Sequence, residues 1–177
     1  VDNFWLGTTD LSLTLMSPDV KAELSVLGLG TPSGLFRDPT TLRIGERVWK
    51  AGRRTGVTTG TIRSLSETVD SAPDPHIRYK GWPIRYPGAI TVKGEPGVHL
   101  LSGGDSGCVY FDSWMNLVGA GLGAGIALGG DPNNPDNTIH AIQPAIWIQT
   151  FLQASGYLFA ITWSGSEKGN NCILLAG

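Results

Sequence analysis

The sequence has little charge, little cysteine and little histidine. Lys, Arg, Asp and Glu together make up 16% of its 177 residues, and the formal net charge is −2. A chain with this balance presents no broad basic surface, so neither nucleic acid nor an anionic membrane is expected as a partner. The only basic doublet, Arg53-Arg54, is expected to be a solvated hairpin turn.

No continuous apolar run is long enough to predict a membrane span. Residues 137–166 contain no Asp, Glu, Lys or Arg, but Gln143, Pro144 and Gln149 interrupt them. This stretch therefore predicts a core helix and a strand instead. The chain begins with Val1 and carries no signal peptide, which we interpret as a processed, engineered or partial chain.

Two cysteines and few acidic clusters leave little basis for a disulfide framework or a metal site. Cys108 and Cys172 could pair in a secreted chain, but the sequence leaves both the thiol and the disulfide open. The loop 131–137 has carboxylates and amides that could hold calcium, yet their spacing matches no known cage, and a plain loop is favoured. We expect no metal and no cofactor.

What the sequence does have is turn residues between short apolar segments. Its 25 Gly and 11 Pro, with many Thr and Val, favour short strands joined by turns. Residues 17–44 have the composition of a connector, and regular strand signals begin at Gly45. The predicted strands are 47–50, 58–64, 77–79, 88–93, 108–112, 117–121, 138–142 and 158–163, with a helix from Pro144 to just before Gly156.

The pentapeptide Gly104-Asp105-Ser106-Gly107-Cys108 is the strongest chemical signal. It places one hydroxyl in a tight turn between glycines, which allow backbone N–H groups to point at a substrate carbonyl. Such a hydroxyl becomes a nucleophile when a base takes its proton and donors hold the oxyanion. An ordinary turn remains the alternative, because Gly, Asp and Ser dominate turns.

The order of motifs resembles the second β-barrel of the chymotrypsin-like serine proteases. The hairpin 48–62 precedes the serine turn, Gln143-Pro144 leads into the C-terminal helix, and the segment 10–15 resembles the strand that begins with the triad aspartate. The resemblance implies an all-β fold, a six-stranded antiparallel Greek-key barrel with a short C-terminal helix. Residues 1–44 would be the end of a first barrel and the connector, and residues 45–177 the second barrel.

The resemblance also implies roles for individual residues. Ser106 is the expected nucleophile, the N–H groups of Gly104 and Ser106 form the oxyanion hole, and Asp10 orients a histidine. Asp105 is expected to fix the turn. The expected substrate-binding residues are Leu100 and Leu101 at the base of the primary pocket, with Leu122 and Gly123 on the strand that pairs with the substrate. With no Asp or Glu at that pocket, apolar or small residues are expected before the cleaved bond.

The histidine of the resembled family is missing from its expected place. It lies about forty-five residues before the aspartate in that family, whereas only nine residues precede Asp10 and none is His. The histidines present are His76, His99 and His140, which are expected to be core or pocket residues. In some relatives a pocket histidine reads an acidic substrate side chain, a role open to His140.

Two competing motifs fail on their context. Residues 119–124 fit the dinucleotide fingerprint, but the glycines and proline that follow exclude the helix it needs. The fifth residue of the serine motif is Cys108, which disfavours an α/β-hydrolase elbow. A small ligand-binding β-barrel has no motif of its own to support it.

The sequence therefore predicts the C-terminal part of a serine endopeptidase, secreted or otherwise extracytoplasmic, that acts on protein or peptide substrates. An upstream fragment or partner chain would supply the histidine. The alternative is an inactive protease-like domain that serves as a binding or structural module.

Overall fold

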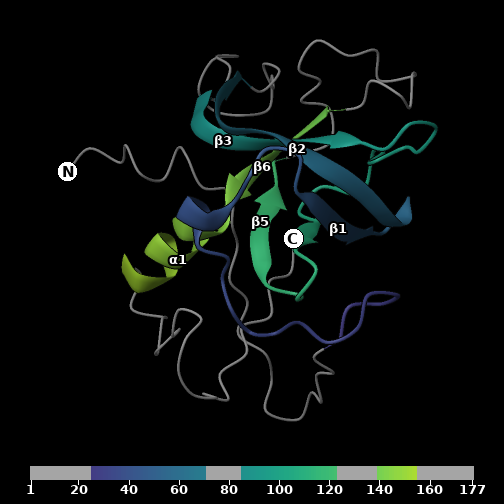
Figure 1. Cartoon of the computed structure of the whole chain (residues 1–177), viewed down its shortest axis with the longest axis horizontal. Coiled ribbons are helices and arrows are strands. Elements are labelled where there is room, and N and C mark those ends of the chain that lie inside the picture. The colour runs from purple at the N-terminus through teal and green to yellow at the C-terminus, as the bar shows by residue number, and fades with distance from the viewer. Residues whose placement is uncertain (1–24, 71–84, 123–138, 155–177) are drawn as a thin grey trace.

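The computed structural model of the chain describes residues 25–70, 85–122 and 139–154 (Figure 1). Within them lie a short 3-10 helix, six strands and one α-helix. Their bounds are η1 (Pro39–Thr41), β1 (Arg47–Gly52), β2 (Gly56–Asp70), β3 (Arg85–Gly94), β4 (Val109–Phe111), β5 (Leu117–Gly121), β6 (Ile139–Pro144) and α1 (Ala145–Ala154).

The six strands form one closed barrel in the order β1-β2-β3-β6-β5-β4. Every neighbouring pair is antiparallel, including the closing pair of β1 and β4, where Trp49 lies opposite Phe111 and Lys50 opposite Tyr110. Closure leaves no unpaired sheet edge between these strands. The predicted six-stranded antiparallel barrel with a short helix after it is thus confirmed.

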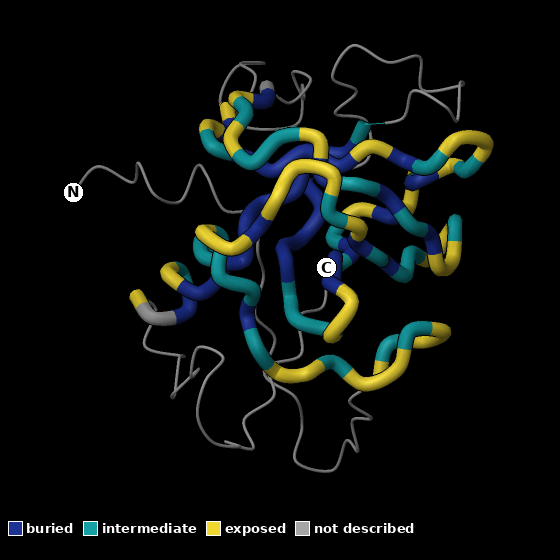
Figure 2. Tube along the Cα trace, viewed as in Figure 1, coloured by how far each residue is buried: buried dark blue, intermediate teal, exposed yellow. Residues whose placement is uncertain are grey.

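Alternation of side chains along the strands builds the core. In β1 Val48 and Lys50 are buried while Arg47 is exposed, as the twofold period of a strand requires. The main core cluster fills the barrel interior and comprises Leu42, Val48, Ile62, Ile90, Val92, Leu100, Cys108, Tyr110, Val118 and Ile142. Figure 2 shows this burial along the central strands, with exposed positions concentrated at the turns between them.

Helix α1 covers one side of the barrel through an apolar stripe. Ala145, Ile148 and Leu152, spaced three and four residues apart, pack with Phe36 and Ala120. No helix in the described part of the chain has the length and apolar character needed to cross a membrane.

Most predicted elements are present, with shifted ends. β2 runs to Asp70, well past the predicted end, and irregularities in its register with β3 between Ile62 and Val69 accompany this length. Pro144 ends β6 instead of starting the helix, which begins one residue later. The predicted strands 77–79 and 158–163 lie outside the described residues.

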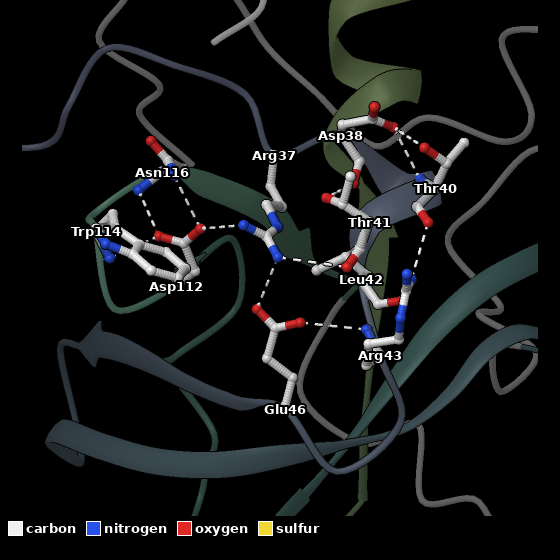
Figure 3. Close-up of polar contacts among 10 residues, drawn as sticks. All are labelled: Arg37, Asp38, Thr40, Thr41, Leu42, Arg43, Glu46, Asp112, Trp114 and Asn116. Atoms are coloured by element: carbon white, nitrogen blue, oxygen red, sulfur yellow. Dashed lines mark hydrogen bonds and ion pairs between the residues drawn. The ribbon is translucent and has the colours of Figure 1, made fainter. Parts of the chain in front are cut away.

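The connector before the barrel is fastened to the turn between β4 and β5 (Figure 3). The Arg37 guanidinium contacts Asp112 at 3.4 Å and Glu46 at 3.2 Å, and lies 5.6 Å from the ring centroid of Trp114. The Asp112 carboxylate also accepts hydrogen bonds from the amides of Trp114 and Asn116, each at 2.9 Å. Backbone bonds join Arg37 N to Leu117 O and Leu117 N to Leu35 O, so the connector continues the sheet beside β5.

Candidate active site

Ser106 lies on an exposed turn that leads into β4. The turn is closed by hydrogen bonds from the Asp105 amide to the Ser102 carbonyl and from the Cys108 amide to the Asp105 carbonyl, both at 3.0 Å. Gly104 and Gly107 have φ values of 103° and 77°, which side chains disfavour. Two of the motif's glycines are therefore required by the path of the backbone.

Asp105, which precedes Ser106, anchors this turn inside the barrel. Its side chain is fully buried. The carboxylate accepts hydrogen bonds from the Arg54 amide at 2.7 Å, the Ser102 amide at 3.0 Å and the Thr55 hydroxyl at 2.6 Å. Burial alone would raise the pKa of Asp105, but these hydrogen bonds lower it to about 2. The carboxylate is therefore ionised at neutral pH and holds the serine turn against the β1–β2 hairpin.

Lys50 on β1 supplies the counter-charge. Its side chain is fully buried, and Nζ lies 2.6 Å from the Thr55 hydroxyl and 3.5 Å from Oδ2 of Asp105. A β-carbon at Gly52 would collide with both Asp105 and Lys50, so only glycine leaves room for this pair. The pairing offsets the cost of burying two charges. The expected role of Asp105 in fixing the turn agrees with these contacts.

The predicted oxyanion hole depends on the backbone amides of Gly104 and Ser106. The Gly104 amide donates to no acceptor among the described residues. A β-carbon at Gly104 would meet nothing within 4 Å, so this side of the turn is open. An amide in that position can donate to the oxygen of a substrate carbonyl as negative charge develops on it.

The serine turn lies between two different parts of the barrel wall. β4 pairs with β1 on one side and with β5 on the other. On the β1 side, Arg54 and Thr55 donate hydrogen bonds to Asp105. On the β5 side, the Gly121 amide donates to the Cys108 carbonyl at 2.8 Å. The serine turn therefore lies between the β1–β2 turn and the end of β5.

The two described histidines do not contact the serine hydroxyl. His140 is buried, and its Nδ1 lies 2.6 Å from the Tyr110 hydroxyl, while its Nε2 has no partner among the described residues. Burial lowers the pKa of His140 to about 4, with a further contribution from the charge of Lys50, so the ring is neutral at pH 7. His99 is exposed and forms no hydrogen bond or ion pair in the described ranges.

Gly121 is the neighbour that makes room for His140. A β-carbon at Gly121 would lie 2.5 Å from Cε1 and 3.0 Å from Nε2 of the ring. Cys108, nearby in the core, is a free thiol whose pKa is raised to about 11 by burial. It therefore stays protonated and is not a competing nucleophile.

The predicted pocket residues contribute to packing. Leu100 is fully buried in the main core cluster, and its carbonyl accepts a hydrogen bond from the Thr58 hydroxyl at 2.8 Å. Leu101 is half-buried and packs against that cluster. Leu122 is buried in a second cluster with Val69 and Tyr86. Asp10, His76, Gly123 and Cys172 lie outside the described residues.

Sequence reasoning missed Lys50 and Thr55 as supports of the serine turn. A signal was present for Lys50, because the alternation in Val48-Trp49-Lys50 places the lysine on the same face as buried Val48. A lysine at an inward position needs a buried anion, and the aspartate of the serine motif was available. Thr55 had no such signal, since its role depends on how the hairpin docks.

Comparisons with known proteins gave matches in structure only. No protein-family model matches the sequence, and no curated protein matches it. Solved structures similar to the chain include a glutamic acid-specific serine protease that uses a histidine triad in substrate binding (20% identity, TM-score 0.48) and Cellulomonas bogoriensis chymotrypsin (24%, 0.45). Thermobifida fusca Protease A is also similar (22%, 0.45).

These matches cover 80%, 73% and 73% of this chain. The chain in turn spans 60%, 56% and 55% of the three proteases. The solved structures to which it is similar are chymotrypsin-like serine proteases, and it has the closed six-stranded barrel and following short helix expected of that fold.

Proposed function

We propose that the chain is the C-terminal part of a serine endopeptidase, with Ser106 as its nucleophile. The observation that carries this proposal is the exposed Ser106 on a glycine turn fixed from inside by the buried Asp105–Lys50 pair. A turn held in this way keeps its amides in place before the substrate arrives, and such preorganised donors stabilise an oxyanion. The amides of Gly104 and Ser106 would hold the carbonyl oxygen of the substrate.

The reaction would proceed through an acyl-enzyme. The Ser106 oxygen attacks the carbonyl carbon of the peptide bond, and a base takes the hydroxyl proton and passes it to the leaving amine. Water then releases the acyl group. His140 is engaged with Tyr110, and His99 makes no bond to the serine. His76 lies outside the described residues, and no histidine precedes Asp10, where the resembled family has its base. The proposed base is therefore a histidine on an upstream fragment or partner chain, oriented by Asp10.

The substrate is a protein or peptide. Leu122 and Gly123 would lie beside the residues before the cleaved bond, with Leu100 and Leu101 beneath the primary pocket. These side chains favour an apolar or small residue there, because a buried cation would have no carboxylate partner. Secretion is the expected localisation of such an enzyme.

A fluorophosphonate probe tests the nucleophile. We expect the chain alone to label weakly, because none of its three histidines stands where the resembled family has its base, before Asp10. It should label strongly once the upstream part of its own gene product is joined to it or added. Labelling should vanish in Ser106→Ala and persist in Ser33→Ala, another exposed serine. Undiminished labelling of Ser106→Ala would show that the nucleophile is elsewhere, and strong proteolysis by the chain alone would contradict the need for a second part.

An inactive protease-like module is the second candidate. It is favoured by the lack of a hydrogen bond from either described histidine to Ser106. Its signature would be a chain that, joined to its upstream part, binds peptides but leaves Ser106 unlabelled.

A further inference from the structure

Arg53 and Arg54 form an exposed pair of cations, and no described carboxylate contacts either guanidinium. Neither guanidinium makes a hydrogen bond or ion pair within the described ranges. Three other described arginines form salt bridges with carboxylates: Arg37 with Glu46 and Asp112, Arg47 with Glu95, and Arg63 with Glu67. In a chain whose formal charge is −2, the doublet is a local positive site whose charge no described carboxylate offsets.

The doublet is held next to the proposed nucleophile. The Arg54 amide donates to Oδ1 of Asp105 at 2.7 Å, and the Thr55 amide donates to the same oxygen at 3.3 Å. Because Asp105 adjoins Ser106 in sequence, the backbone that carries both arginines is fixed directly against the serine turn. Gly56 follows this three-residue turn, and its φ of 65° is the left-handed conformation in which such hairpin turns end.

Barrel topology determines which part of a substrate would meet the arginines. The serine turn leads into β4, with β5 on one side and β1 on the other. If the residues before the cleaved bond lie along the end of β5, the residues after it run toward the β1–β2 turn. An extended peptide advances about 3.3 Å per residue, so its second and third residues beyond the bond come over that turn.

We propose that Arg53 and Arg54 select substrates with acidic side chains on the leaving-group side of the cleaved bond. This inference rests on the proposed function. The only carboxylate that contacts the turn, within the described part of the chain, is Asp105, and its charge is buried and paired with Lys50. An incoming Asp or Glu therefore meets positive charge with no competing surface anion among the described residues, and an arginine fork can bind it through two hydrogen bonds.

Peptide binding to the full chain, measured by fluorescence anisotropy, tests the proposal. One labelled peptide carries Asp-Glu after a central Leu-Ala, its partner carries Asn-Gln there, and a third carries Asp-Glu before the Leu. We expect the first to bind about tenfold more tightly than the other two, the effect of two exposed ion pairs. The preference should shrink at about 1 M salt, where the Debye length is about 3 Å.

Variants assign the preference to these arginines. Arg53→Gln/Arg54→Gln should bind the first two peptides equally, while Lys93→Gln should keep the preference. Lys93 is a matched control because it is exposed, makes no ion pair in the described ranges and lies on β3, which does not adjoin β4. Equal binding of the peptides by the unmodified chain, no measurable binding, or a preference that survives the double substitution would overturn the proposal.

The fluorophosphonate result separates this inference from the proposed function. Labelled Ser106 without an acidic preference leaves the protease standing and the inference wrong. An acidic preference without labelling, in the chain joined to its upstream part, removes the protease and with it the leaving-group assignment.

Discussion

Replacement of Asp105 by Asn is the perturbation on which the account of the serine turn depends most. Asn keeps the shape of the side chain but removes its charge. The Lys50 ammonium, fully buried, then loses its anion, and the amide nitrogen of Asn adds donors where Thr55, Arg54 and Ser102 already donate. Breaking a buried ion pair by removing one partner costs about 3–5 kcal/mol. We expect Asp105→Asn to lower the free energy of unfolding by about that amount.

The same carboxylate makes stability depend on pH in a defined window. The pKa of Asp105 falls from 3.8 to about 2 on folding, which corresponds to about 2–3 kcal/mol at about 1.4 kcal/mol per pKa unit. Because the folded pKa is the lower one, this contribution is complete above about pH 5. It is lost as the pH falls through 4 toward 2, where the folded carboxyl takes up a proton.

Urea unfolding followed by tryptophan fluorescence measures both effects. Asp38→Asn is the matched control, since Asp38 caps η1 through Thr40 and Asn caps equally well. Lys50→Met combined with Asp105→Asn should recover part of the loss, because no buried charge is left unpaired. If Asp105→Asn unfolds at the same urea concentration as Asp38→Asn, the buried pair does not hold the turn and the reasoning fails.

Two further substitutions test contacts elsewhere in the barrel. Tyr110→Phe leaves both ring nitrogens of His140 unpartnered in the described core and should cost about 1–3 kcal/mol in urea unfolding; no change in midpoint would contradict the hydrogen bond. Arg37→Ala leaves the buried Asp112 without its cation and should lower the thermal midpoint, with Arg37→Lys restoring only part because a lysine lacks the fork that reaches both carboxylates. Full recovery by lysine would show that charge alone suffices.

The barrel was predictable because its strands carry signals that act over short distances. Alternation in β1 and glycine turns such as Gly52–Gly56 locate strand and hairpin from neighbouring residues alone. The residues at which the strands end were less predictable. β2 extends to Asp70 because β3 pairs with it from Gly60 onward, and Arg85, the partner of Asp70, lies in the next strand across an intervening segment.

In the candidate site, too, local features were predictable from the sequence and long-range contacts were not. The turn around Ser106 follows from its own glycines, whose positive φ values are local. The burial of Leu100 was not predictable, because Thr58 and Gly60 pack against it from β2, a strand far back along the chain. Likewise the bond from Tyr110 to His140 joins β4 to β6, which are not neighbours in the barrel, so the twofold pattern of neither strand reveals it.

The buried pair of Lys50 and Asp105 joins β1, the first barrel strand along the chain, to the serine turn. The serine turn leads into β4, the shortest strand of the barrel. β4 has only Val109–Phe111, and it meets β1 through just the Trp49–Phe111 and Lys50–Tyr110 positions. The shaping of the serine turn and the closing of the barrel are therefore one folding event. A nascent or partly opened chain would hold Ser106 on an unformed loop, so the serine turn would take its shape only as the barrel closes.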